Sequence, residues 1–152
     1  MRYSVRTFAP GDEYTLVLCD QQANDFEGDS LADAIRLLAA NGPAFVLEQR
    51  HGPVLAIAGV ASIQQGLGYG WAFMSGHSAR HMRWVTRTVR QYLDDAIQRH
   101  RRIEIVAREQ FVQAVNWAYM LGFELEGTAR ALAPDGADML RFARVNPDWK
   151  AS

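Results

Sequence analysis

The clearest pattern of apolar and polar positions runs from Arg102 to Gly127, where a strand, a helix and a second strand follow one another closely. Ile103, Ile105 and Ala107 alternate with Glu104 and Val106, which predicts a strand with at least one buried face. The next apolar residues fall mostly on one side of a helix: Phe111, Ala114, Val115, Ala118, Tyr119 and Leu121. Gly122 follows, where glycine ends a helix at little conformational cost. This compact unit predicts a helix packed against a sheet, with a site at a strand end.

The rest of the chain alternates strands and helices. Strands are predicted at residues 3–8, 45–49, 54–63 and 71–74, and a closing hairpin at 128–132 and 139–145. A short helix is predicted over Glu13–Cys19 and another after an N-cap at Asp29–Ser30. The longest helix is predicted to follow an N-cap at Ser78 and to reach about His100. The expected order is strand, two helices, three strands, helix, strand, helix, two strands.

Size and composition predict one soluble α/β domain over residues 1–152. The formal charge of −1 argues against nonspecific nucleic-acid binding, which needs a basic surplus. Cys19 is the single cysteine, so no internal disulfide is possible. The chain shows no signal segment, no membrane-spanning apolar run and no metal-ligand spacing. We therefore expect a cytosolic-type protein without a metal.

Several segments together resemble one family. Ala114, Leu121–Glu124 and Glu126–Gly127 resemble the second half of the GNAT superfamily of N-acetyltransferases. Further matching segments are Pro53–Gly59, Trp71–Phe73, the helix after Ser78, Arg102–Glu104 and Pro134–Asp138. The closer resemblance is to GNAT-like proteins of tailed phages and prophages, some of which are internal virion proteins. It covers about residues 46–145 and implies a GNAT fold: a mixed, mostly antiparallel sheet of about seven strands flanked by about four helices.

The resemblance implies that acetyl-CoA lies between the strands Trp71–Met74 and Ile103–Ala107. Its pyrophosphate would sit on free amides at the start of the long helix, over Met74–Arg80. This loop keeps Gly76 but loses the family's glycine pattern. Side chains of His77 and Arg80 could compensate by adding contacts, or side chains here could block the phosphate. The residues expected to bind the cofactor are Trp71, Phe73, Met74, Ser75, Gly76, His77, Ser78, Ala79, Arg80, Arg83 and Ala114.

The general acid of the family is altered. Active members usually carry a tyrosine four residues before the glycine that ends the last helix, and this chain has Ala118 there. Tyr119 lies one residue later, about 100° round the helix, and is the remaining candidate acid; packing is its alternative role. The asparagine often found at the start of that helix corresponds to Phe111. Water can protonate the thiolate instead.

Two residues are candidates for the general base that takes a proton from an amine. Glu104 is the first, because a carboxylate on the central strand could face the acceptor. Its alternative is a solvent-facing strand residue paired with an arginine. His77 is the second, since histidine titrates near neutral pH; a loop or capping role is its alternative.

Four arginines form a stripe on the long helix, which we call the arginine stripe: Arg80, Arg83, Arg87 and Arg90. One interpretation is a solvated face balanced by Asp94 and Asp95. The others are a contact from Arg80 or Arg83 to the 3′-phosphate of CoA, or a docking face for an acidic partner.

The leading hypothesis is an acetyl-CoA-dependent N-acetyltransferase of phage or prophage type, transferring the acyl group directly to an amine. The competing hypothesis is a catalytically degenerate GNAT-like protein, associated with a virion or bound to a host protein. A third is an adaptor or inhibitor that acts through the arginine stripe. We expect it in the host cytoplasm or a virion, with an amine acceptor and a homo-oligomer as candidate partners, and no membrane or specific nucleic acid. The acceptor, acyl chain and oligomeric state stay open.

Overall fold

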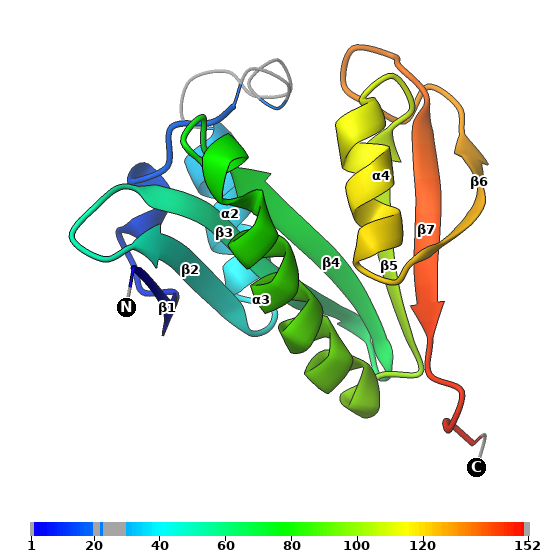
Figure 1. The fold of residues 1–152 in the computed structure, drawn as a ribbon. Coiled ribbons are helices and arrows are strands. Elements are labelled where there is room, and N and C mark those ends of the chain that lie inside the picture. The colour runs from blue at the N-terminus through cyan, green and yellow to red at the C-terminus, as the bar shows by residue number, and fades with distance from the viewer. Residues whose placement is uncertain (1, 20–21, 23–29, 151–152) are drawn as a thin grey trace. The chain divides into compact units, whose positions relative to one another are not determined.

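A computed structural model describes residues 2–19, 22 and 30–150 of the chain. The N-terminal elements are β1 (Tyr3–Thr7), the 3-10 helix η1 (Asp12–Tyr14), α2 (Ser30–Ala39), β2 (Ala44–Gln49), β3 (Val54–Gln64) and β4 (Leu67–Met74) (Figure 1). After them come the 3-10 helix η2 (Ser78–His81), α3 (Met82–Ala96) and the 3-10 helix η3 (Ile97–Arg99). The chain continues with β5 (Arg102–Arg108), α4 (Val112–Met120), β6 (Glu124–Ala129) and β7 (Met139–Val145).

The seven strands form one sheet in the order β1-β2-β3-β4-β5-β7-β6. The β1–β2, β2–β3, β5–β7 and β6–β7 pairs are antiparallel. β4 and β5 pair in parallel, through Leu67–Tyr69 and Arg102–Glu104. The predicted mixed, mostly antiparallel sheet of seven strands is confirmed. Three α-helices lie in the described residues, where about four were expected.

The chain forms two compact units, which we describe separately. Unit 1 comprises residues 1–61 and 70–85, and unit 2 comprises residues 62–69 and 86–152. β3, β4 and α3 each contribute residues to both. Across the described residues, no helix combines the length and apolar character that crossing a bilayer requires.

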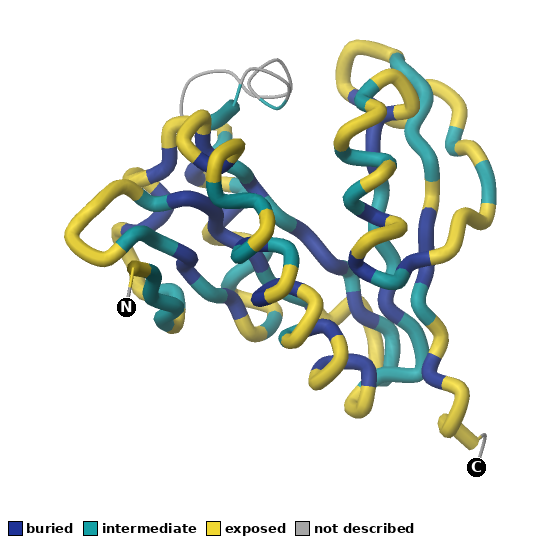
Figure 2. Tube along the Cα trace, viewed as in Figure 1, coloured by how far each residue is buried: buried dark blue, intermediate teal, exposed yellow. Residues whose placement is uncertain are grey.

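In unit 1, the buried positions fall along the strands and helices (Figure 2), and they form the core of this unit. Figure 1 shows α2 behind strands β2–β4 and the start of α3 in front of them. Ile35 of α2 and Val85 of α3 are both fully buried, because each helix turns an apolar stripe to the strands. The strands contribute Val46, Leu47, Leu55 and Ile57. This packing fixes the ends of β2 and β4, near which the candidate site lies.

The core of unit 2 lies under α4, around the fully buried Ile103 and Phe142. α4 ends as predicted, with Gly122 at φ 90° in the left-handed region. Two arginines cover its last carbonyls: Arg90 donates to the C=O of Met120 (2.7 Å) and Arg144 to that of Leu121 (3.1 Å). They satisfy acceptors that the end of a helix leaves without intrahelical partners.

The short helix predicted over Glu13–Cys19 is wrong. In this segment the structure has only the 3-10 turn η1, and Leu18 then forms an antiparallel bridge with Ser75. The physical reason is that the backbone finds partners outside a helix: Cys19 N–H donates to Met74 C=O (2.9 Å), and Val17 C=O accepts from Gly76 N–H (3.1 Å).

Two other predicted details differ. Ser78 does not cap the long helix: it lies inside η2, and its hydroxyl donates to Ser75 C=O (2.8 Å). The strand predicted over Thr128–Leu132 ends at Ala129, since Ala131 takes a positive φ of 55° and its N–H donates to Asp138 (2.8 Å). Asp29 of the predicted Asp29–Ser30 cap lies outside the described residues.

Candidate functional site

The turn between β4 and η2 is held by its own chain. Ser75 N–H donates to Leu55 C=O (2.9 Å) and Gly76 N–H to Val17 C=O (3.1 Å). His77 N–H donates to Ser75 Oγ (3.1 Å), and Ser78 N–H to Ser75 C=O (3.1 Å). Four successive amides therefore have partners within unit 1. An anion at this turn would rely on side chains and later amides instead.

A pocket of about 410 Å³ opens at the same turn, within unit 1. It is lined by Gln49 at the end of β2 and by Gly76, His77, Ala79, Arg80 and His81. A methyl group placed on Gly76 would meet no atom within 4 Å, so the space above this glycine is open. Arginine and histidine in the lining favour an anionic ligand.

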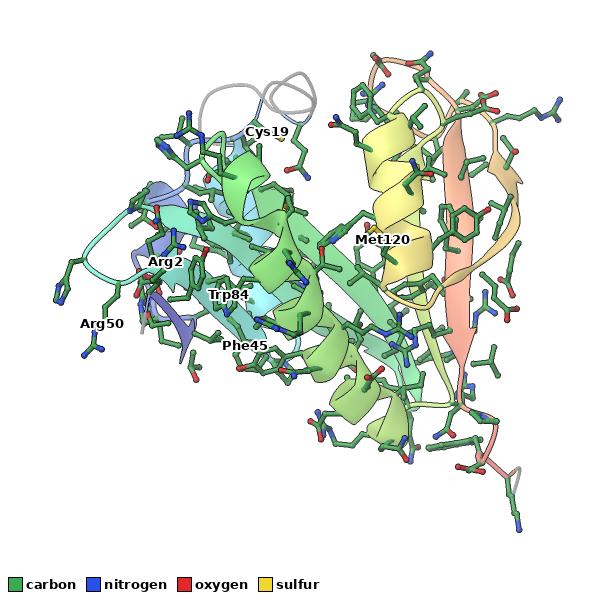
Figure 3. All side chains as sticks on the ribbon, in the orientation of Figure 1. Arg2, Cys19, Phe45, Arg50, Trp84 and Met120 are labelled. Atoms are coloured by element: carbon green, nitrogen blue, oxygen red, sulfur yellow. The ribbon has the colours of Figure 1, made fainter. Side chains whose placement is uncertain are left out.

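His81, in the pocket wall, is positioned by an aromatic cluster. Its Nδ1 shares a hydrogen bond with the hydroxyl of Tyr3 (2.8 Å). The ring of Tyr3 stacks on that of Trp84, which is labelled in Figure 3, with centroids 4.3 Å apart and planes 10° from parallel. Arg2 lies over the ring of Tyr3, with its guanidinium carbon 5.5 Å from the ring centroid. β1 thus fixes one wall of the pocket.

β4 supplies the predicted Trp71 and Phe73, but their side chains belong to the core. Each is 8% exposed, and their ring centroids are 5.8 Å apart. A ligand would therefore meet the backbone of this strand rather than these rings. Met74 is half-buried, Ser75 and Ser78 are buried, and Ala79, Arg80 and Arg83 are exposed.

The edge of β4 that points away from β3 is occupied near its end. Because Ser75 N–H reaches Leu55 of β3, the C=O of the same peptide, from Met74, points to the opposite edge. There the carboxamide of Gln22 bridges two residues: its Nε2 donates to Ala72 C=O (2.9 Å), and its Oε1 accepts from Met74 N–H (2.7 Å). Cys19, labelled in Figure 3, adds its N–H to Met74 C=O.

In unit 2, Glu104 belongs to an ion-pair network. Arg102 Nε donates to Glu104 Oε1 (2.7 Å), and the two terminal nitrogens of Arg102 both bind Glu126. Arg102 lowers the pKa of the Glu126 carboxyl through this bonding. Arg102 is thus the arginine partner that the alternative interpretation of Glu104, a solvent-facing strand residue in an ion pair, predicts. Its role as a base stays a prediction.

Tyr69 of β4 is the register partner of Glu104 and was not among the predicted site residues. Burial raises the pKa of its phenol, so the hydroxyl stays protonated and able to donate.

Tyr119 and Ala114 lie on α4. Tyr119 is 49% exposed, and its ring meets that of Phe142 edge-on, with centroids 5.4 Å apart. Ala114 is half-buried, whereas Ala118, at the usual position of the acid, is 1% exposed. A side chain at position 118 would enter the core of unit 2 in this structure. The exposed side chain of Tyr119 is therefore more accessible to a ligand than a side chain at position 118 would be.

Comparison with known proteins rests on structure. No protein-family model and no curated protein sequence matches the chain. Ard1 from Thermoplasma volcanium superposes with a TM-score of 0.77 at 13% identity, over 95% of this chain and 98% of that one. A probable GNAT-family acetyltransferase from Chromobacterium violaceum gives 0.75 at 18%, over 99% and 86%. The ribosomal-protein-S5-alanine acetyltransferase from Vibrio fischeri gives 0.67 at 16%, over 99% and 97%. The chain has the GNAT fold. At these identities, the likeness establishes the fold alone.

Within this GNAT fold, the arginine stripe is less balanced than its sequence suggests. All four arginines are exposed. Asp94 pairs with Arg144 (2.8 Å) and Asp95 with Arg99 (2.7 Å), so neither pairs with the stripe. In the part of the chain that the structure describes, no carboxylate pairs with Arg80, Arg83 or Arg87. These three remain available to an anion.

Sequence patterns missed several residues that the GNAT fold brings to the site: Tyr3, Gln22, Gln49 and His81. Gln49 and Tyr3 reach it only because β1 pairs with β2, where they are register partners. Gln22 follows no periodic pattern and acts through one side-chain amide. Among the described residues, no three His, Cys, Asp or Glu side chains gather as metal ligands.

Proposed function

We propose that this protein is an acetyl-CoA-dependent N-acetyltransferase that transfers the acetyl group directly to an amine. The observation that carries the proposal is the pocket at the start of η2, lined by His77, Arg80 and His81, in a chain with the GNAT fold. Its volume falls in the range of ordinary ligand sites. Its cationic lining suits the phosphates of CoA.

Side chains would hold those phosphates. The amides of Ser75–Ser78 already donate within the chain, so Arg80, His77 and Arg83 would replace them as phosphate ligands. The acceptor amine would attack the thioester carbonyl and lose a proton to Glu104 or His77. The departing thiolate would take a proton from Tyr119 or from water, because Ala118 carries no acid.

The acceptor is an amine of a small molecule or a protein. Among similar structures, one is a spermidine N-acetyltransferase and another a ribosomal-protein-S5-alanine acetyltransferase. The resemblance to phage and prophage GNAT-like proteins leads us to propose action in a bacterial host cytoplasm or carriage in a virion.

Calorimetric titration with acetyl-CoA, and separately with CoA, tests the proposal. We expect saturable binding of both, and release of free thiol when a panel of amines is added. Glu104→Gln should keep the affinity for acetyl-CoA but slow turnover; unchanged turnover would remove Glu104 as the base. An absence of binding heat, together with an unshifted melting curve, would overturn the proposal.

A second candidate is a GNAT-fold binding protein without catalysis. The engaged amides of Ser75–Ser78 and the buried Ala118 favour it. Such a protein would bind a virion or host partner, and the arginine stripe is the surface we would test. Reversing Arg83 and Arg87 to Glu should then abolish capture of that partner; capture that persists would return the stripe to a solvated face.

A further inference from the structure

We infer that Gln22 sets the affinity for acetyl-CoA, because its side-chain amide occupies backbone groups of β4 that an extended amide ligand would use. This inference rests on the proposed function. It concerns one side chain of unit 1 and the edge of β4 that points away from β3.

That edge of β4 offers backbone hydrogen-bonding groups to a ligand. A strand edge without a partner strand exposes N–H and C=O groups that bind an added strand or an amide-bearing chain. Ala72 C=O and Met74 N–H are two such groups on one edge of β4. The pantetheine arm of CoA is an extended chain with two amides, and amides of this kind match an acceptor and a donor on a strand edge.

Both groups already have a partner from within the chain. Gln22 donates to Ala72 C=O at 2.9 Å and accepts from Met74 N–H at 2.7 Å, so one carboxamide satisfies an acceptor and a donor two residues apart. These distances are those of well-formed hydrogen bonds. A ligand amide cannot use either group until Gln22 leaves it.

This edge of β4 does not line the phosphate pocket. The pocket is lined by Gln49 and by residues of the Gly76–His81 segment, and Gln22 is not among its lining residues. A ligand that carries phosphates but no pantetheine should therefore ignore Gln22. Gln22 should lower the affinity for a ligand that carries both phosphates and pantetheine.

The size of the effect follows from the bonds exchanged. The parent must give up its two Gln22 bonds before CoA can bind, a loss comparable to one ordinary hydrogen bond once water solvates the freed carboxamide, so removing Gln22 should tighten CoA roughly threefold to tenfold.

The test measures calorimetric affinities of CoA and of adenosine 3′,5′-bisphosphate, which lacks the pantetheine arm. Gln22→Ala removes the competing amide, and Gln22→Met removes it while keeping most of the side-chain volume. Gln98→Ala, at an exposed position of η3, is the control. Melting curves confirm that each variant is folded.

We expect both Gln22 variants to bind CoA more tightly than the parent, with the affinity for the bisphosphate unchanged. Amide exchange gives a second reading: Met74 N–H should exchange faster in Gln22→Ala and regain protection when CoA is added.

Three results would overturn the inference. If the parent binds CoA and the Gln22 variants bind it equally or more weakly, Gln22 is structural and the proposed function stands. An equal gain for CoA and the bisphosphate would show a general effect on the site rather than competition at β4. If no variant binds either ligand, the inference and the proposed function both fail.

Discussion

Asp12 fixes the turn after β1 through three charge-assisted contacts. Arg6 donates to its two carboxylate oxygens at 2.8 and 2.9 Å, and Ala9 N–H donates to Oδ2 at 2.7 Å. These bonds, above all those from Arg6, hold the pKa of the Asp12 carboxyl below its ordinary value of 3.8. A carboxyl whose pKa is lower in the folded state stabilises the fold above its unfolded pKa. That stabilisation is lost as the pH falls through the folded pKa.

We therefore predict that Asp12→Asn lowers the free energy of unfolding at pH 7 by roughly 1 to 3 kcal/mol, the cost of losing hydrogen bonds to a charged group. The difference from the parent should begin to shrink below about pH 4, where the unfolded chain takes up the proton, and should be lost once the pH falls below the lowered pKa of Asp12 in the folded state. Urea unfolding of both proteins at pH 7 and between about pH 4 and pH 2 measures this difference in the free energy of unfolding. Asp95→Asn is the control, since its pair with Arg99 is exposed and should contribute little. A difference that stays constant down to pH 2 would contradict the assignment.

Asn146 joins the end of β7 to the end of the long helix. Its buried Nδ2 donates to Ile97 C=O (2.9 Å), and its Oδ1 accepts from Asp148 N–H (2.9 Å). We predict that Asn146→Ala lowers the free energy of unfolding by roughly 1 to 3 kcal/mol, because it removes a buried hydrogen bond and leaves Ile97 C=O with only the longer bond from His100 N–H (3.3 Å). Asn116→Ala, at an exposed position of α4, should change it by less than about 0.5 kcal/mol. Equal effects of the two substitutions in denaturant titrations would contradict this role.

At the scale of elements, the periodicity of the sequence predicted those helices and strands that depend on contacts between neighbouring residues. The helical spacing of α4, the glycine after it and the alternation along β5 all depend on neighbouring residues, and the structure has each of them. The helix prediction for Glu13–Cys19 was wrong because the backbone of this segment bonds to the end of β4 and the turn after it, more than fifty residues away. No pattern within the segment encodes those bonds.

The candidate site was predictable to the same extent. The turn after β4 follows from the family resemblance, and it is where the pocket lies. The sequence does not predict that the amides of this turn already have partners, because the carbonyls of Leu55 and Val17 come from distant segments of the chain. Gln22 was missed for the same reason: a single side chain with no sequence period becomes important only through the strand that it meets.

Gly59 shows how closely two elements of unit 1 approach. A methyl group on it would lie 2.4 Å from the Pro43 carbonyl oxygen and 2.9 Å from a ring carbon of Trp71. We predict that Gly59→Ala lowers the free energy of unfolding by roughly 1 to 3 kcal/mol, because backbone and a core indole would have to move. Gly76→Ala is the matched control, with open space at its methyl position. Thermal unfolding of both variants tests it, and an unchanged melting temperature for Gly59→Ala would show that the strands can separate at little cost.

At the scale of the whole molecule, a formal charge of −1 coexists with a concentrated basic stripe. The chain as a whole offers little long-range attraction to an anion, so binding of CoA must depend on local contacts. The structure divides the stripe by position: Arg80 lines the pocket from η2, and Arg87 follows seven residues later, in α3. This division makes the contribution of each arginine measurable.

We predict that Arg80→Ala weakens CoA roughly tenfold or more, the loss expected when a charged hydrogen bond to phosphate is removed. Arg87→Ala should weaken it by less than about threefold, because Arg87 acts only through screened charge at a distance. Raising the salt from 50 to 500 mM should weaken the parent and Arg87→Ala alike, and Arg80→Ala less, since that variant has already lost its phosphate contact. Titration calorimetry at both salt concentrations measures all three proteins. Equal losses for the two variants would mean that the stripe acts as a diffuse field and that the pocket at η2 is not where the phosphates bind.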